Sequence, residues 1–259
     1  MDGSKSELYE YDGVDEKIIL LNDNGDFRSD ECTKIKEQSD IIVSNPPFSL
    51  LREIIDWLED KDFILLGNQN AITYKNVFPK IKKGTIKLGV TYRGGSIFFK
   101  QPTIFNDVKV YKINGKNCIK MGSVHWFTTL DHGFIPQPIP LLKKYTPEEY
   151  PKYDNYDAIN VDKTKDIPMD YEGVMGVPIT FLDKYCPEQF EIIGGFNGYK
   201  ECDYENSLLC GDVTEYYDKN NILKNWTGPT VNKHPKYYRI LIRNRKPRNN
   251  YRHLQNDLI

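Results

Sequence analysis

The stretch Ile41-Ile42-Val43-Ser44-Asn45-Pro46-Pro47-Phe48 decides the fold of this chain. Its apolar first half predicts a short buried strand, and the amphipathic segment from Leu50 to Leu58 predicts a helix directly after it. The two prolines fix their own φ angles and remove two backbone donors, and Pro46 keeps Asn45 out of the α conformation. The sequence therefore predicts a rigid corner at the carboxyl end of a strand, which is where ligands bind in open α/β sheets.

Strands and helices alternate on both sides of this corner. Ser29 and Ser49 are candidate N-caps for the two helices that flank the Asp40–Ser44 strand. The alternation indicates βαβ units and a mostly parallel sheet. The expected strands are Lys17–Leu21, Asp40–Ser44 and Phe63–Leu66, and the expected helices are Ser29–Gln38, Leu50–Glu59 and Tyr74–Lys83.

After about Lys87 the pattern changes to short strands with turns between them, which resembles a meander or an antiparallel edge. The Tyr145–Met175 segment is rich in Tyr, Asp, Pro and Gly and predicts an ordered, loop-rich region. We therefore divide the chain into residues 1–140 and 141–259. The expected late strands are Ile86–Val90, Ser96–Phe99, Val108–Tyr111, Val124–Phe127, Phe190–Gly194 and Tyr238–Ile242.

The bulk composition is that of an ordinary globular protein. The chain has 259 residues, 39% hydrophobic residues and a net charge of −2. No apolar run approaches the roughly 18 residues of a membrane span, and there is no signal-peptide pattern, so we expect a cytoplasmic protein. The five cysteines are scattered and form no CxxC pair, which predicts reduced thiols rather than a disulfide framework or a zinc site.

The charge is distributed unevenly along the chain. Between Lys219 and Asn256 there are ten Lys or Arg residues and no Asp or Glu, with Trp226, Tyr237 and Tyr238 among them. A basic segment with interspersed aromatic residues is typical of contact with nucleic-acid phosphates. A solvated tail that contacts nothing fits the same composition.

The corner has the chemistry to activate an aromatic amine. The Asn45 side-chain oxygen and the adjacent proline carbonyl can each accept one hydrogen of an amino group, which localises the nitrogen lone pair and makes it nucleophilic. Phe48 can stack on the ring that carries the amine, a contact worth roughly 1–3 kcal/mol per base. Adenine N6 fits this description. The alternative is a loop in which Phe48 is only a core residue.

The residues around this corner resemble a known family. Asp40–Phe48 matches motif IV of amino-group DNA methyltransferases, and Gly25-Asp26-Phe27 is similar to their motif III. The closer resemblance, over most of the chain, is to the EcoRI-type adenine-specific DNA methyltransferases. It is carried by residues 25–29, 45–50, 72–75, 150–161, 163–168 and 173–182.

This resemblance implies transfer of a methyl group from S-adenosylmethionine to adenine N6 in a short double-stranded DNA sequence, with the adenine flipped out of the helix. In the family, the modification protects host DNA from a partner restriction endonuclease. The implied target-adenine site is Asn45, Pro46, Pro47 and Phe48, and the implied cofactor neighbours are Asp26 and Phe27.

The implied fold class is α/β, a partial Rossmann-like methyltransferase sheet followed by a loop-rich DNA-recognition region. The family places its main cofactor-binding loop well upstream of motif IV, whereas only 44 residues precede Asn45 here. The resemblance therefore implies an N-terminally truncated member. We expect weak or no cofactor binding by the chain alone, unless a separate N-terminal segment supplies it. A permuted cofactor loop at Glu191–Gly198 is the alternative, and a surface turn at Gly194–Gly198 is the interpretation we favour.

Several alternatives stay open at this point. Asn68 and Asn70 follow a predicted strand and either contact DNA or serve as turn residues. The four histidines have no metal-ligand spacing, so we assign no metal. We place target recognition in the Tyr150–Pro178 run and the basic segment. A non-catalytic DNA-binding remnant, or methylation of an RNA adenine or a protein glutamine, would also fit the corner.

Overall fold

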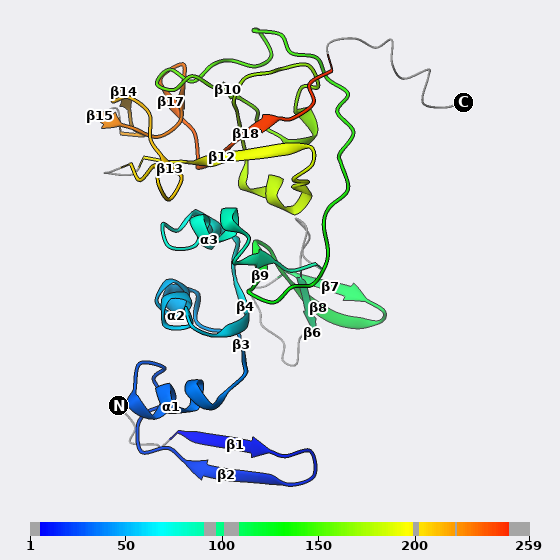
Figure 1. The fold of residues 1–259 in the computed structure, drawn as a ribbon, viewed down its shortest axis with the longest axis vertical. Helices are drawn as coiled ribbons and strands as arrows, with labels where there is room; N and C mark the ends of the chain where they lie inside the picture. Colours follow the sequence, from blue (N-terminus) through cyan, green and yellow to red (C-terminus); the bar gives the residue numbers. More distant parts are fainter. Residues whose placement is uncertain (1–5, 91–96, 101–108, 199–201, 221, 249–259) are drawn as a thin grey trace.

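The computed structural model describes residues 6–90, 97–100, 109–198, 202–220 and 222–248. Figure 1 shows an N-terminal hairpin at one end of the molecule, a small sheet with helices in the middle and a larger sheet at the other end. The helices are α1 (Asp30–Gln38), α2 (Leu51–Trp57) and α3 (Phe78–Lys83), with 3-10 segments η1 (Phe48–Leu50), η2 (Gln69–Thr73), η3 (Thr164–Asp166) and η4 (Ile179–Lys184).

The middle sheet has four strands in the order β3 (Ile41–Ser44), β4 (Asp62–Asn68), β9 (Val124–Thr128) and β5 (Lys87–Leu88). β3 and β4 are parallel and are connected through η1 and α2, which confirms the βαβ unit expected around the corner. β9 is antiparallel to both β4 and β5. The sheet is therefore mixed α/β, and the parallel pattern expected from the first helices ends at β4.

The larger sheet has five strands in the order β10 (Ile159–Asn160), β11 (Met175–Val177), β18 (Arg239–Asn244), β12 (Phe190–Phe196) and β13 (Leu208–Leu209). The turn expected at Gly194–Gly198 is wrong for its first part, since Gly194 and Gly195 lie inside β12 and pair with β18. Glycine is required there because a Cβ would collide with Leu209 or Tyr238.

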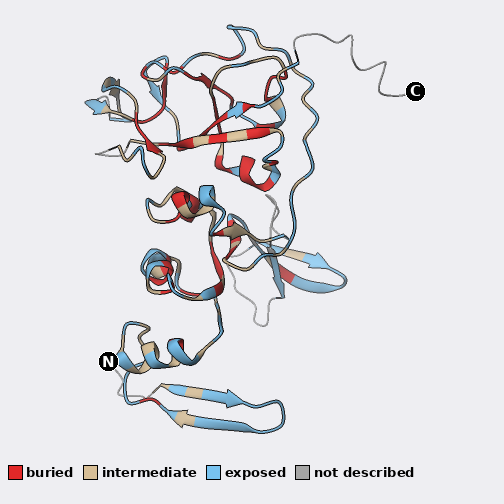
Figure 2. Ribbon diagram, in the orientation of Figure 1, coloured by how far each residue is buried: buried red, intermediate tan, exposed pale blue. Residues whose placement is uncertain are grey.

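Four small antiparallel units surround these sheets: β1 (Glu7–Tyr11) with β2 (Glu16–Leu20), β6 (Ile97–Lys100) and β7 (Val110–Ile113) with β8 (Lys116–Met121), β14 (Thr214–Tyr217) with β15 (Leu223–Trp226), and β16 (Thr230–Val231) with β17 (His234–Pro235). The expected buried strand at Lys17–Leu21 is wrong in its environment, because β2 pairs with β1 alone and is largely exposed (Figure 2). Ser96 and Val108, expected at strand starts, lie outside the described residues.

One hydrophobic core joins the middle and larger sheets. It includes Leu51 and Phe63 from the middle layer and Phe181 and Ile240 from the larger one. Helix α3 lies between them (Figure 1), and its Lys82 Nζ donates hydrogen bonds to the Ile193 carbonyl at 2.8 Å and to Ser207 Oγ at 2.7 Å. Each fully buried large apolar side chain contributes about 1.5–3 kcal/mol, so this shared core fixes the two sheets against each other.

The helix termini confirm one expected cap and correct the other. Ser29 caps α1, its Oγ accepting from the Cys32 N–H at 3.2 Å. Ser49 caps nothing, because the chain leaves the corner through η1 and the Leu50 N–H donates to the Pro47 carbonyl at 2.9 Å. The expected helix start at Tyr74 is also wrong, because η2 occupies Gln69–Thr73 and α3 begins at Phe78.

The expectation that all cysteines are reduced is wrong for one pair. Cys202 and Cys210 form a disulfide with a Cα–Cα separation of 5.6 Å. The chain between them folds back through reciprocal hydrogen bonds of Asp203 with Leu208, which brings the two thiols together without a CxxC pattern. Cys32, Cys118 and Cys186 are free. None of the helices in the described ranges combines the length and the hydropathy of a membrane span.

Candidate active site

The corner predicted from the sequence lies at the carboxyl end of β3. The parallel register pairs Ser44 with Leu65, so Asn45 follows the strand at the edge where β4 also ends. Asn45 is exposed, Pro46 is buried and Phe48 is half-buried. The buried proline anchors the turn in the protein, while the amide beside it faces outward.

Two acceptors of this corner have no hydrogen-bond partner within the described residues. In the part of the chain that the structure describes, neither the Asn45 side chain nor the Pro46 carbonyl has a hydrogen-bond partner, whereas the Pro47 carbonyl is used by Leu50. Carbonyl oxygens accept hydrogen bonds readily, and exposed ones bind water until a ligand replaces it. The corner thus carries two unpaired acceptors within three residues of one half-buried aromatic ring.

The next strand brings a second group of polar side chains to the same edge. β4 ends at Asn68, whose Oδ1 accepts from the Asn70 N–H at 2.8 Å and caps η2. This is the turn role considered for Asn68. The Asn70 side-chain oxygen instead accepts a 3.2 Å hydrogen bond from the Tyr237 hydroxyl, which precedes β18 in the larger sheet. The edge of the middle sheet therefore meets the C-terminal region at Asn70.

Helix α2 contributes a cation–π contact next to this edge. The Arg52 guanidinium lies over the Tyr74 ring at 4.7 Å from the ring centre. Asn76 Nδ2 donates to the Arg52 carbonyl at 3.1 Å and to Asp56 Oδ1 at 2.8 Å. The sequence did not predict the contacts of Arg52 with Tyr74 and Asn76. The only signal for the cation–π contact was that an Arg and a Tyr follow neighbouring strands.

The segment expected to contact the cofactor lies between β2 and α1. Asp26 pairs with Arg28 through both oxygens, at 2.9 Å from Oδ1 to Nε and 2.6 Å from Oδ2 to Nη2. The hydrogen bonds from the Arg28 side chain and backbone lower the pKa of Asp26 to about 2. Arg28 also reaches Glu53 of α2 at 3.4 Å. This carboxylate is therefore ionised and held in place by its neighbour.

Phe27 packs against the other end of α2. Its ring meets the Trp57 ring edge-on, with centroids 5.5 Å apart. Lys36 lies over the same Trp57 ring at 5.1 Å and donates to the Trp57 carbonyl at 3.1 Å and to Asp60 at 2.8 Å. Phe27 thus contacts α2 directly, and Asp26 is linked to the same helix through Arg28 and Glu53. The N-terminal end of α2 follows the Asn45–Phe48 corner.

Asp26 and Phe27 fit a cofactor that carries an adenosine group, because one can accept a hydrogen bond and the other offers an apolar ring. A carboxylate offers about four lone-pair sites, and Arg28 occupies one on Asp26 Oδ2, so an amino group can share that oxygen. Phe27 is half-buried, which leaves part of its ring for contact with an apolar ligand edge. Among the described residues, no cluster of three or more His, Cys, Asp or Glu side chains could hold a metal ion.

The two regions expected to recognise DNA differ in how many of their side chains are exposed and unpaired. Tyr150, Tyr153 and Asn160 are buried, so much of the Tyr150–Pro178 run builds the core of the larger sheet. In the basic segment, Arg239 pairs with Asp162 at 3.2 Å and Arg243 with Glu191 at 3.6 Å. These two cations therefore have carboxylate partners within the fold, and residues farther along the segment, such as Lys246 and Arg248, are exposed.

Comparison with known proteins gives a consistent set of relatives. A family model described as adenine-specific methyltransferase EcoRI matches residues 4–245. The type II methyltransferase M.EcoRI of Escherichia coli is 45% identical over 217 residues, covering 78% of this chain and 67% of the relative. M.MgeORF184P of Mycoplasma genitalium is 38% identical over 73% of this chain and 62% of its own length.

M.MpnI of Mycoplasma pneumoniae, also a type II methyltransferase, is 37% identical over 71% of this chain and 60% of its own length. The chain thus spans about two thirds of the length of these curated relatives. No solved structure matches it. The family model covers the described sheets and the Asn45–Phe48 corner alike, and this chain belongs to the EcoRI family of adenine-specific methyltransferases.

Proposed function

We propose that this chain carries the adenine-binding part of a type II DNA methyltransferase that transfers a methyl group from S-adenosylmethionine to adenine N6. The observation that carries the proposal is the pair of unpartnered acceptors, the Asn45 amide and the Pro46 carbonyl, beside the half-buried Phe48 ring. Family membership supports the reaction, and these side chains supply its acceptor chemistry.

The corner acts on the amine before and during transfer. The Asn45 Oδ1 and the Pro46 carbonyl each accept one N6 hydrogen, so the nitrogen lone pair no longer delocalises into the ring. Phe48 stacks on the adenine, which must leave the DNA helix at a cost of a few kcal/mol. The methyl group would come from the bound cofactor, and the excess proton of N6 would pass to solvent water, since methylation makes it acidic.

The cofactor supplies an electrophilic methyl group when it is bound. We assign Asp26 as an acceptor for its adenine amine and Phe27 as an apolar neighbour of its ring. Because the Asp26 carboxylate is fixed by Arg28 and ionised, it can accept such a donor throughout the physiological pH range. We assign Pro47 to the same corner, where it sets the geometry between Asn45 and Phe48.

Among the described residues, β3 pairs with β4 alone, and its other edge fits a further strand from a separate segment. β3 is an edge strand, and its Ile41 and Val43 side chains are 46% and 68% exposed. Apolar side chains on an unpaired parallel strand are usually covered, because parallel sheets are buried on both faces. We propose that a cofactor-binding segment pairs there and completes the methyl-donor side of the site.

We divide the chain near residue 140, with the acceptor corner in residues 1–140 and DNA recognition in residues 141–259. The enzyme would act in the cytoplasm and protect host DNA from a cognate endonuclease. The test measures transfer of labelled methyl groups to duplex DNA, RNA and protein. It uses the chain alone and the chain mixed with the third of M.EcoRI that the match leaves out.

We expect labelled N6-methyladenine in DNA from the mixture at a higher rate than from the chain alone. Equal rates would contradict the β3-edge proposal. Transfer to RNA adenine or protein glutamine in place of DNA would contradict the substrate assignment. DNA binding without any transfer in either sample would identify a non-catalytic DNA-binding remnant instead.

A further inference from the structure

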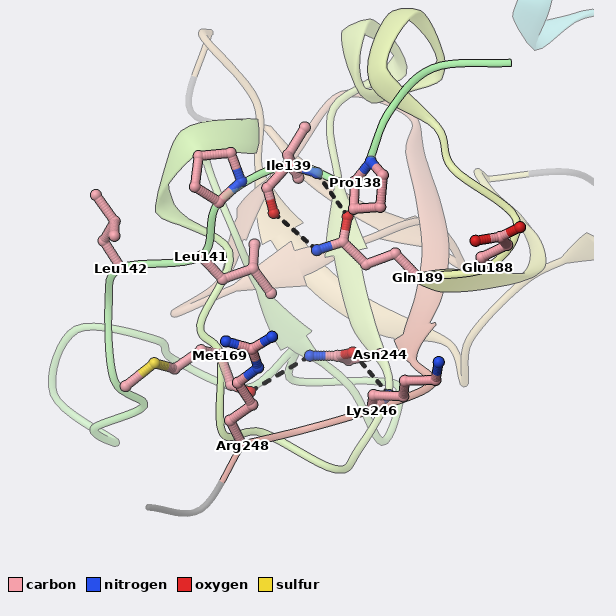
Figure 3. Close-up of a pocket in the computed structure, with 11 residues that line it drawn as sticks. Pro138, Ile139, Leu141, Leu142, Met169, Glu188, Gln189, Asn244, Lys246 and Arg248 are labelled. Carbon is pink, nitrogen blue, oxygen red and sulfur yellow. Dashed lines mark hydrogen bonds between the residues drawn. The ribbon is translucent and has the colours of Figure 1, made fainter. Parts of the chain in front are cut away.

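A cavity of about 520 Å³ lies at the end of β18, outside the corner. Figure 3 shows that the extended segment after β9 forms one wall and the chain after β18 forms the floor. The wall is apolar, with Ile139, Leu141 and Leu142, and Met169 continues it. The floor carries two cations, Lys246 and Arg248. The cavity thus combines an apolar side with a positively charged one.

The apolar wall is held by a pair of hydrogen bonds. The Gln189 side chain accepts from the Ile139 N–H at 2.8 Å and donates to the Ile139 carbonyl at 2.8 Å (Figure 3). This pairing is the same one that a neighbouring strand would provide, so the extended segment has a fixed position. The wall is therefore formed before any ligand arrives.

The cationic floor is also held by backbone contacts. The Arg248 N–H donates to the Met169 carbonyl at 2.8 Å, and the Lys246 N–H donates to Asn244 Oδ1 at 3.0 Å. Asn244 is buried and directs its own Nδ2 to the Met169 carbonyl at 3.4 Å. The backbone that carries both cations is therefore fixed, while their charged ends remain at the surface.

These two cations differ from the earlier basic residues of the same segment. Arg239 and Arg243 have carboxylate partners, whereas within the described ranges no ion pair is formed by Lys246 or Arg248. Glu188 also lines the cavity, and Figure 3 places it beyond Gln189, at the opposite end from Arg248. Two free cations beside an apolar wall match a phosphodiester, whose charge meets the cations and whose sugar meets the wall.

We propose that this cavity binds a backbone phosphate of the DNA substrate at a distance from the target adenine. The position follows from β18, since Tyr237 precedes the strand at the catalytic edge and Lys246 follows it. Nine residue steps separate Tyr237 from Lys246, which corresponds to at most about 30 Å at roughly 3.3 Å per residue. At 3.4 Å per phosphate along one strand, the contact lies roughly nine nucleotides from Tyr237. This proposal rests on the proposed function, which supplies the DNA.

The test compares DNA binding by Lys246→Gln/Arg248→Gln with binding by a charge-matched control, Lys34→Gln/Lys184→Gln. Both control lysines are exposed and have no carboxylate partner within the described ranges. Each protein is titrated with methylatable duplexes that extend about 5 or about 15 base pairs beyond the target adenine, at several salt concentrations.

We expect the cavity variant to lose about three- to tenfold affinity for the long duplex and none for the short one. The slope of log affinity against log salt should fall by about 1, the value for one lost phosphate contact. Leu142→Asp, at a residue that is 75% exposed, should give a similar loss without affecting the fold, because its carboxylate repels the phosphate.

Equal losses in the cavity variant and the control would overturn the assignment, as would a loss on the short duplex or no loss at all. The proposed function fails in a different way, through methyl transfer that does not go to DNA. If the unmodified chain transfers methyl groups to DNA and the cavity variant binds both duplexes with normal affinity, only the cavity assignment is refuted.

Discussion

The Tyr237 hydroxyl donates a 3.2 Å hydrogen bond to the Asn70 side-chain oxygen, joining residues that are 167 positions apart in the sequence. Asn70 lies just after β4, at the edge where the Asn45 corner also lies, and Tyr237 precedes β18 of the larger sheet. The contact is therefore a direct link between the proposed adenine site and the region that we assign to DNA recognition.

The coupling across this link is measurable in a double-mutant cycle of Tyr237→Phe and Asn70→Ala. Tyr237 is 57% exposed, so solvent competes for the bond and we expect a coupling energy of only about 0.5–1 kcal/mol. Urea unfolding of the two single variants and the double variant gives the value. Strictly additive effects would show that the hydrogen bond does not persist in solution.

The Lys36 side chain is the expected anchor of α1 on α2. It is 9% exposed and bonds both the Trp57 carbonyl and Asp60. Lys36→Ala removes the contact with Trp57 and leaves its carbonyl without that donor, so we expect a loss of about 1–3 kcal/mol in unfolding free energy. Lys34→Ala, on an exposed position of the same helix, is the control and should change stability by less than about 0.5 kcal/mol.

Removal of the Arg28 charge should change the titration of Asp26. The hydrogen bonds from Arg28 lower the pKa of Asp26 to about 2 from its ordinary value of 3.8, and Arg28→Gln should return it toward that value. Since the folded-state pKa is depressed, the pair contributes stability above pH 3.8, and this contribution is lost as the pH falls toward 2. NMR titration of the Asp26 carboxyl carbon measures the shift, and an unchanged pKa in the variant would refute the pairing.

The disulfide between Cys202 and Cys210 predicts a redox-dependent stability. It closes a loop over a sequence separation of 8 residues, for which chain entropy gives about 2–3 kcal/mol. We expect the unreduced protein to lose stability of this size on treatment with dithiothreitol, and Cys202→Ser/Cys210→Ser to be insensitive to it. Mass spectrometry under native conditions checks the bond directly, and two free thiols at these positions would contradict it.

Local sequence signals predicted the acceptor corner because all its determinants are adjacent. A β-branched run followed by two prolines places Asn45 at the end of β3 without reference to the rest of the chain. The environment of Lys17–Leu21 could not be predicted in the same way, since an apolar run fits a buried strand and a hairpin equally well. Pairing with β1 decided the outcome and left the strand exposed.

Contacts between distant segments had no comparable signal. The bond between Tyr237 and Asn70 depends on how α3 holds the two sheets together, which neither residue's neighbours specify. The Cys202–Cys210 pairing depends on a turn through Asp203 and Leu208 rather than on cysteine spacing. The buried share of the Tyr150–Pro178 run was missed because its polar and aromatic residues also suit base contacts.

The central claim is that Asn45 accepts a hydrogen of the target amine, and the rate of labelled methyl transfer to DNA by Asn45→Ala tests it most directly. Asn225→Ala, on an exposed position of β15, is the matched control. Loss of one preorganised hydrogen-bonding group at a reacting centre costs about 100-fold or more in rate. We predict that Asn45→Ala loses about 100-fold or more in transfer rate and keeps its affinity for DNA. The rate is measured with the chain alone or mixed with the additional segment, whichever of the two supports transfer by the unmodified chain. Transfer by Asn45→Ala at the rate of the control would contradict the account.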